Sequence, residues 1–131
     1  MKPYFATDLV ITDVDGEDLM WELVEELILI DSKGVSHTVP RGYQGDLSSI
    51  PRLFWMIFPP QTSRKACWPH DYYYSEQVGK TRAEADQVLL EGMIAEGLGK
   101  VRRQIIYRAV RLGGWMYWNK RQREKKLNTS K

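Results

Sequence analysis

Hydrophobic residues recur at two periods along the chain, about every second position before residue 50 and about every 3.6 positions after it. In the first part, the run 9–11 ends near Asp15-Gly16, a dipeptide typical of a tight hairpin turn. The run 21–30 is predicted to be the next strand, because isoleucines alternate near its end and glycines flank it, although its Glu-Leu-Val-Glu-Glu-Leu segment would also suit a helix. A third strand is predicted over residues 35–39.

The clearest helical prediction is a helix from Arg82 to about Gly97. Thr81 and Glu84 match a capping box, in which the two side chains bind backbone N–H groups at opposite ends of the first turn. On this helix Asp86 shares a stripe with apolar residues at helical spacing, which is an unusual position for a carboxylate. The helix therefore contributes both to the core and to any polar site next to it.

Prolines indicate two shorter helical segments before that helix. Pro51 is expected at the first position of a turn over residues 51–58, because its missing N–H costs nothing there. Pro69 is expected to start a helix that carries residues 70–75 in the same way. This boundary would put His70 and the aspartate that follows it in the first turn, where the helix dipole favours a carboxylate and a neutral imidazole.

The last helix is predicted over residues 100–121, with its arginines outward and a weak point at its Gly-Gly pair. Its inward residues are expected to be Ile105, Ala109, Leu112 and Met116. The sequence thus predicts an α+β fold, with a small antiparallel N-terminal sheet packed on about three C-terminal helices. We expect a single domain over residues 1–123 and a mobile basic tail over residues 124–131.

Composition and charge limit the function classes. No apolar run approaches the roughly 18 to 20 residues that a membrane span needs, and the N-terminus lacks the features of a secretory signal. The lone Cys67 excludes an intramolecular disulfide and indicates a reducing compartment. The net charge is +2, but the first third is acidic and the C-terminal end is basic. Because no nucleic-acid motif accompanies the basic end, the sequence argues against nucleic acid as a partner.

Four polar residues form the candidate catalytic site: Asp46, His70, Asp71 and Asp86. One small core seldom holds so many polar groups unless each is paired. His70 could act as a general base oriented by a carboxylate. Alternatively, His70, Asp46 and Asp86 could bind a divalent metal ion, because one imidazole with carboxylates suits Mn, Fe, Zn or Mg. A polar network that ties the helices to the preceding loop is the third interpretation.

Substrate contacts are predicted from residues in or near the same segments. They are Ser49, Arg52, Trp55 and Tyr74. Each has a structural alternative, since the serine is placed to cap a helix and the aromatic residues are suited to core packing. Cys67, three residues before His70, could form a nucleophilic dyad with it or be an inert core residue.

Two resemblances add to these residues. The string His70-Asp71-x-x-Tyr74 is similar to the helix of secreted phospholipases, which pairs its histidine with an aspartate on the next helix. Those enzymes rely on disulfides and a glycine-rich calcium loop that this sequence lacks, so lipid hydrolysis is a minor alternative.

The second resemblance covers residues 35–118. Its motifs are Gly42-Tyr43, Asp46, Ser49-Ile50-Pro51-Arg52, Trp55, Pro59-Pro60, Ala66, His70-Asp71, Tyr74, Arg82-Ala83-Glu84-Ala85-Asp86 and Met93. In this pattern the chain resembles the phage-associated family known as domain of unknown function 1353. Leu47-Ser48 and the residues Cys67 and Pro69 depart from the usual family pattern. The resemblance implies a protein encoded by a tailed phage or prophage.

Two function classes follow from the residues and the resemblance together. The first is a small phage-encoded hydrolase with a His/Asp site, metal-dependent or not, that acts on the cell envelope or a host small molecule. The second is a non-catalytic structural or assembly component of the virion, such as a tail component, that contacts other phage proteins or its own copies. Both imply synthesis in the host cytoplasm, and the second implies incorporation into the virion.

Overall fold

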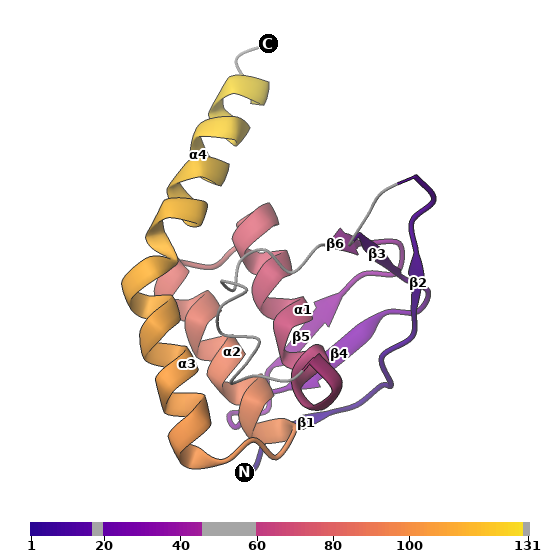
Figure 1. Cartoon of the computed structure of the whole chain (residues 1–131), viewed down its shortest axis with the longest axis vertical. Helices are drawn as coiled ribbons and strands as arrows, with labels where there is room; N and C mark the ends of the chain where they lie inside the picture. The colour runs from indigo at the N-terminus through magenta and orange to yellow at the C-terminus, as the bar shows by residue number, and fades with distance from the viewer. Residues whose placement is uncertain (17–19, 46–59, 130–131) are drawn as a thin grey trace.

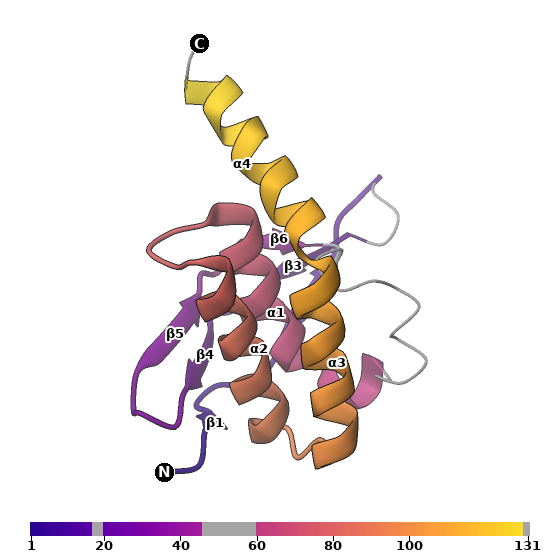
Figure 2. The same ribbon diagram turned by 90° about the vertical axis from the view of Figure 1, so that its left-hand side faces the viewer.

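The computed structural model of the chain describes residues 1–16, 20–45 and 60–129. Strands occupy the part before residue 46 and helices the part after residue 59, as Figure 1 shows. In both views the helices α1 (Pro60–Glu76), α2 (Arg82–Ala95) and α3 (Lys100–Gly113) lie side by side, and the strands lie on the side of α1 and α2 away from α3 (Figures 1 and 2). This arrangement confirms the predicted α+β class.

The described strands form two antiparallel sheets instead of one. One sheet has the order β1 (Tyr4–Phe5), β4 (Leu27–Ile30), β5 (Ser36–Val39), and the other has the order β2 (Ile11–Asp13), β3 (Trp21–Leu23), β6 (Gln44–Gly45). The expectation that residues 21–30 form one strand is therefore wrong. Leu23 and Leu27 are both fully buried four residues apart. A strand would place them on one face only if residue 25 also pointed inward, but that residue is an exposed glutamate. The chain therefore turns there, leaves the β2–β3–β6 sheet and enters the β1–β4–β5 sheet.

The hairpin turns follow the sequence prediction. Strands β2 and β3 pair with Ile11 opposite Leu23 and Asp13 opposite Trp21. Gly16, in the turn between them, has a φ of 79°, in the left-handed region that favours glycine. Strands β4 and β5 pair from Leu27 opposite Val39 to Ile30 opposite Ser36, as expected from the turn before residue 35.

Four helices follow in the described part of the chain: α1 (Pro60–Glu76), α2 (Arg82–Ala95), α3 (Lys100–Gly113) and α4 (Trp115–Thr129). The capping box at the start of α2 is confirmed, because Thr81 accepts from the Glu84 N–H and the Glu84 carboxylate accepts from the Thr81 N–H. The predicted start at Pro69 is wrong, since this proline lies inside α1. His70 therefore lies in the second half of a helix, and the dipole of a helix N-terminus does not set its protonation.

The predicted inward face of α3 is also wrong. Ile105 is 44% exposed and Leu112 is 79% exposed, whereas Ile106 and Val110 are buried. Met116, in α4, is 60% exposed. The helix carries two apolar stripes on nearly opposite sides, and periodicity alone does not show which of them meets the core.

The C-terminal segment continues as helix. Helix α4 reaches Thr129, whereas the sequence suggested a helix end at Arg121 and a mobile tail from residue 124. Residues 124–127 are good helix formers, and Arg121 forms an ion pair with Glu124 one turn further on. Figures 1 and 2 show α4 extending beyond the other elements.

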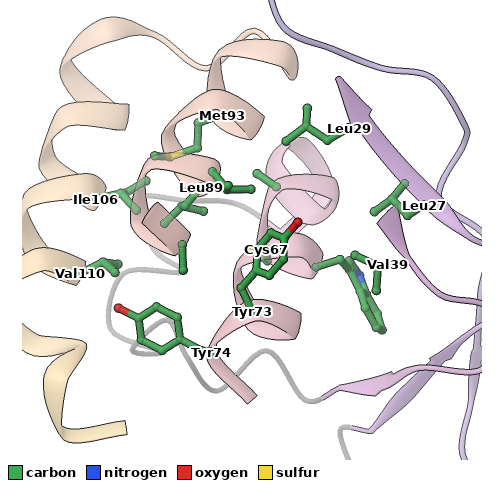
Figure 3. Packing of buried hydrophobic residues seen from close by; sticks show 14 of the residues in the cluster. Leu27, Leu29, Val39, Cys67, Tyr73, Tyr74, Leu89, Met93, Ile106 and Val110 are labelled. Carbon is green, nitrogen blue, oxygen red and sulfur yellow. The ribbon is translucent and has the colours of Figure 1, made fainter. Parts of the chain in front are cut away.

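The hydrophobic core lies between the sheet formed by β1, β4 and β5 and the three helices α1 to α3. Figure 3 shows Leu27, Leu29 and Val39 on the sheet side and Leu89, Met93, Ile106 and Val110 on the helix side. Helices α1 and α2 approach closely where Gly92 faces Ala66, since a Cβ atom on Gly92 would lie 2.9 Å from the Ala66 Cβ atom. This close packing brings the polar residues of the two helices into contact.

Candidate functional site: a buried His-Asp-Tyr network

His70 and Asp86 form a hydrogen bond across the interface between α1 and α2. The distance from His70 Nε2 to Asp86 Oδ1 is 2.9 Å, and neither side chain has any exposed surface. Tyr74, one turn after His70, donates its hydroxyl to the same carboxylate oxygen at 2.6 Å. The Tyr74 ring is tilted against the His70 ring, with centroids 4.3 Å apart. The carboxylate thus fixes two side chains of one helix from the neighbouring helix.

Two arginines bind the other oxygen of Asp86. Arg111, from α3, donates from Nη1 to Oδ2 at 2.7 Å. Arg82, one turn before Asp86 on α2, lies 3.4 Å from Oδ2 and also donates to the carbonyl of Arg111 at 3.2 Å. The network therefore joins three helices through one carboxylate, and both arginines are partly exposed while the carboxylate is buried.

These contacts determine the charge of Asp86. Burial alone would raise the pKa of Asp86, but hydrogen bonds from His70, Tyr74 and Arg111, together with attraction to His70, hold this pKa below its usual value. Burial raises the pKa of the Tyr74 phenol, and the bond to Asp86 raises it further. Asp86 is therefore an ionised acceptor, and Tyr74 is a neutral donor.

An ionised carboxylate fixes the tautomer of the imidazole. Asp86 can only accept, so the proton of the His70–Asp86 bond lies on Nε2. In a neutral ring the basic lone pair then lies on Nδ1. This is the arrangement of a histidine that serves as a general base and is oriented by a carboxylate, which also stabilises the imidazolium that forms.

Asp71 belongs to a second polar set on the other side of α1. Its Oδ2 atom accepts from the Tyr43 hydroxyl at 2.9 Å, and this hydroxyl lies 2.7 Å from Ser75 Oγ. Gly45 packs against the same carboxylate, since a Cβ atom there would lie 2.9 Å from Asp71 Oδ2. Burial and the neighbouring Asp71 charge raise the pKa of the Tyr43 phenol, so this hydroxyl is a stable donor.

A polar cavity of about 400 Å³ opens beside Asp71. Its wall includes Tyr43, Asp71, Ser75, Lys120, Arg121 and Glu124. The cavity thus lies between the β6 end of the second sheet and the first turns of α4. It combines cationic, anionic and hydroxyl groups, which suits a small polar ligand better than an apolar one.

The structure describes half of the predicted site residues. Asp46, His70 and Asp86 are expected to share one site, and the two of them that the structure describes, His70 and Asp86, converge from different helices. Tyr74, predicted to contact substrate, is fully buried in the same network, and Asp71 lies in the set around Tyr43. The other predicted residues, Asp46, Ser49, Arg52 and Trp55, lie outside the described residues.

The described members of the predicted metal-ligand set, His70 and Asp86, do not support the metal-binding interpretation. Among residues 1–16, 20–45 and 60–129, no group of three or more histidine, cysteine or acidic residues could hold a metal ion. Asp86 already faces two guanidinium groups, and their positive charge opposes a cation at this carboxylate. The predicted ligand Asp46 lies outside the described residues, so the metal site stays a prediction.

Cys67 and His37 lie in surroundings that indicate structural roles. Cys67 is a buried thiol, and burial, with the nearby negative charges of Glu96 and Asp71, raises its pKa. A thiolate nucleophile is thus disfavoured. His37 is buried with Tyr73 at 2.9 Å and Asp31 at 2.8 Å, at the edge of the first sheet.

Sequence reasoning missed the arginines on Asp86 and the tyrosine on Asp71. The spacing of four residues between Arg82 and Asp86 on one helix could have indicated their contact. Arg111 and Tyr43 gave no such signal, because their contacts depend on how α3 and the second sheet pack on α1 and α2.

Fold and site together define a small α+β protein with an internal carboxylate that orients a histidine and a tyrosine. The sequence matches the family described as protein of unknown function DUF1353 over residues 21–110, and the chain belongs to this family. No curated protein and no solved structure matches the chain. No helix in the described ranges has the length and apolar character needed to cross a bilayer.

Proposed function

We propose that this protein is a small hydrolase in which His70 and Asp86 act as a general-base dyad. The observation that carries the proposal is the 2.9 Å bond from His70 Nε2 to Asp86 Oδ1, with Tyr74 and Arg111 on the same carboxylate. Placing a carboxylate and a histidine together in a core is unfavourable, and apolar residues of similar size would hold the helices together at least as well. Such departures from good core packing are expected at functional sites.

In the proposed reaction, His70 Nδ1 takes a proton from water as the water oxygen attacks a carbonyl carbon. Asp86 holds Nε2–H and stabilises the resulting imidazolium, which then gives its proton to the leaving oxygen. General-base catalysis of this kind contributes about 10²- to 10⁴-fold to a rate. Because His70 has no exposed surface in this conformation, the reaction requires an opening movement that admits water and substrate to the ring.

The substrate class we propose is a carboxylic ester of the cell envelope. The pairing of a His-Asp-x-x-Tyr helix with an aspartate on the next helix, here Asp86, supports ester chemistry by its local resemblance to secreted phospholipases. Because the sequence lacks the disulfides and calcium loop of those enzymes, a lipid is the less favoured ester. Asp71, beside the histidine in sequence, faces the polar cavity and is placed to bind a polar group there. The family resemblance supports a phage or prophage origin, with synthesis in the host cytoplasm.

A second candidate function is a non-catalytic assembly component of a phage particle. The observation that favours it is the complete burial of His70, Asp86 and Tyr74. In this case the network would be a structural link between α1, α2 and α3, and the exposed helix surfaces would contact other proteins. The two candidates assign opposite consequences to one substitution, so a single pair of variants separates them.

The experiment compares His70→Gln with His37→Gln. His37 is a matched control, because it is also buried and also lies against a carboxylate and a tyrosine, but at the edge of the sheet. Each protein is assayed with a water-soluble short-chain nitrophenyl ester and with phosphatidylglycerol vesicles, and fatty-acid release is measured. We expect His70→Gln to lower the rate by at least about 100-fold and His37→Gln to change it by less than about threefold.

The melting temperatures of the wild-type protein, His70→Gln and His37→Gln show whether a lower rate reflects lost catalysis or lost folding. Loss of activity in a folded His70→Gln variant supports the dyad. Absence of ester hydrolysis in the wild-type protein on both substrates, together with a large loss of stability in His70→Gln, would reject the hydrolase and favour the assembly component. Equal rates in the two variants would also reject a catalytic role for His70.

A further inference from the structure

Helix α3 has a second apolar face that does not contact the core. Val101, Ile105 and Leu112 lie at spacings of four and eleven residues from the first of them, so they form one stripe. They are 73%, 44% and 79% exposed, respectively. The core-facing residues Ile106 and Val110 lie on the opposite side of the helix. The stripe is therefore a separate surface and not the margin of the hydrophobic core.

The start of α4 extends this surface. Trp115 is 50% exposed and Met116 is 60% exposed, directly after the end of α3. Figures 1 and 2 show α3 and α4 as successive segments along one border of the molecule, on the side away from β4 and β5. We call Val101, Ile105, Leu112, Trp115 and Met116 the outer α3 face.

Positive charge surrounds the outer α3 face. Exposed cationic residues on the same two helices are Lys100, Arg102, Arg108, Lys120, Arg123 and Lys126. Between residues 100 and 129 the sequence has one acidic residue, Glu124, and Arg121 forms an ion pair with it. An apolar stripe that includes tryptophan and is bordered by arginine and lysine is the pattern of a helix that lies in a membrane interface.

We propose that the outer α3 face binds the surface of a bilayer that contains anionic phospholipids. Its apolar side chains would enter the region between headgroups and acyl chains, and its cations would contact the phosphates. A second copy of the chain fits less well, because it would bring two positively charged faces together. Nucleic acid also fits less well, because the centre of the face is aliphatic instead of cationic. This inference depends on the surface alone and holds whether or not His70 is catalytic.

The test measures binding to vesicles by sedimentation. Wild-type protein is mixed with equimolar phosphatidylglycerol and phosphatidylcholine vesicles, and separately with phosphatidylcholine vesicles. The variants are Ile105→Gln and Leu112→Gln, with Val35→Gln as the matched control. Val35 is a similarly exposed aliphatic residue, 48% accessible, directly before strand β5. Figures 1 and 2 show β5 on the side of the molecule away from α3.

We expect wild-type protein to bind the anionic vesicles, and to bind them less as salt is raised. Leu112→Gln should weaken binding by about tenfold, Ile105→Gln should weaken it less, and Val35→Gln should change it by less than about twofold. Because the substituted residues are exposed, the variants should keep the wild-type melting temperature. They should also keep any activity on the soluble nitrophenyl ester, so a failure here is distinct from a failure of the hydrolase proposal.

Several results would overturn this proposal. Absence of binding to the anionic vesicles, or equal loss of binding in Leu112→Gln and Val35→Gln, rejects the outer α3 face as a membrane surface. A concentration-dependent dimer in sedimentation velocity that Leu112→Gln abolishes assigns the face to a second copy instead. Binding of duplex DNA that is tighter than vesicle binding and unaffected by Leu112→Gln assigns the positive charge to nucleic acid.

Discussion

Substitution of Asp86 by asparagine tests the network where it carries most of its bonds. The change keeps the shape of the side chain but removes its charge and replaces one acceptor oxygen with an NH₂ donor. If the amide oxygen stays toward His70 and Tyr74, its NH₂ group faces the guanidinium groups of Arg111 and Arg82, which are donors as well. If the amide turns over, the same conflict occurs with His70 Nε2 and Tyr74 Oη.

The expected loss in the free energy of unfolding follows from these contacts. The variant loses charge-assisted bonds to a fully buried group and leaves at least one buried donor without an acceptor, at about 1 to 3 kcal/mol for each such group. Breaking a buried ion pair by removing one partner costs about 3 to 5 kcal/mol, and the partial exposure of both arginines reduces this amount. We therefore expect Asp86→Asn to lower the free energy of unfolding by about 3 kcal/mol, which corresponds to about 10 °C in a domain of this size.

Urea and thermal unfolding followed by circular dichroism measure this change. The control is Asp8→Asn, because Asp8 is almost fully exposed and lies 4.0 Å from Lys65, so its loss should cost less than about 0.5 kcal/mol. The pH dependence adds a second readout. The pKa of Asp86 is lowered by folding, so its contribution to stability is present above its unfolded pKa near 3.8 and disappears as the pH falls toward the folded value. A melting temperature of Asp86→Asn within 2 °C of wild type would refute this reasoning.

Two further predictions concern the surroundings of the network. A Cβ atom on Gly114 would lie 2.4 Å from the hydroxyl of Tyr74, so Gly114→Ala should destabilise the fold by about 1 to 3 kcal/mol. Gly113→Ala, with no atom near the added methyl group, should be neutral or stabilising, so the urea midpoints of the two variants should differ clearly and equal midpoints would contradict the packing. Burial raises the pKa of Glu96, which accepts from the Ala66 N–H at 2.7 Å, to about 7. The free energy of unfolding should therefore fall as the pH rises from about 4.5 to about 7, and Glu96→Gln should remove much of this decline. An unchanged pH profile in the variant would show that another group causes the decline.

The sequence predicted the elements of this fold better than their packing. The α+β class, the hairpin turns and the capped helix α2 follow from local signals, because turns and caps depend on residues close together in the chain. The two faces of α3 could not be distinguished in the same way. Ile105 and Leu112 repeat at helical spacing as well as Ile106 and Val110 do, and only the position of α2 determines which pair is buried.

The candidate site was partly predictable for a similar reason. A carboxylate on an apolar stripe and a histidine among aromatic residues each need a polar partner, and this requirement indicated the His70–Asp86 contact. The contribution of Arg111 depends on the angle at which α3 crosses α2, which no local pattern specifies. The proline inside α1 misled the prediction of the helix start, because proline is far more frequent in the first turn than in a helix interior.

The spacing of α1 and α2 determines whether the His70–Asp86 pair can form at all. The two helices pack through Ala66 and Gly92, where a methyl group on the glycine would already meet the alanine side chain at 2.9 Å. His70 follows Ala66 by one turn on α1, and Asp86 and Gly92 are both buried residues of α2, so both pairs lie within the contact between the two helices. A larger residue at position 92 would push the helices apart and lengthen the 2.9 Å bond. Small residues at this contact are therefore as necessary to the site as the polar side chains themselves.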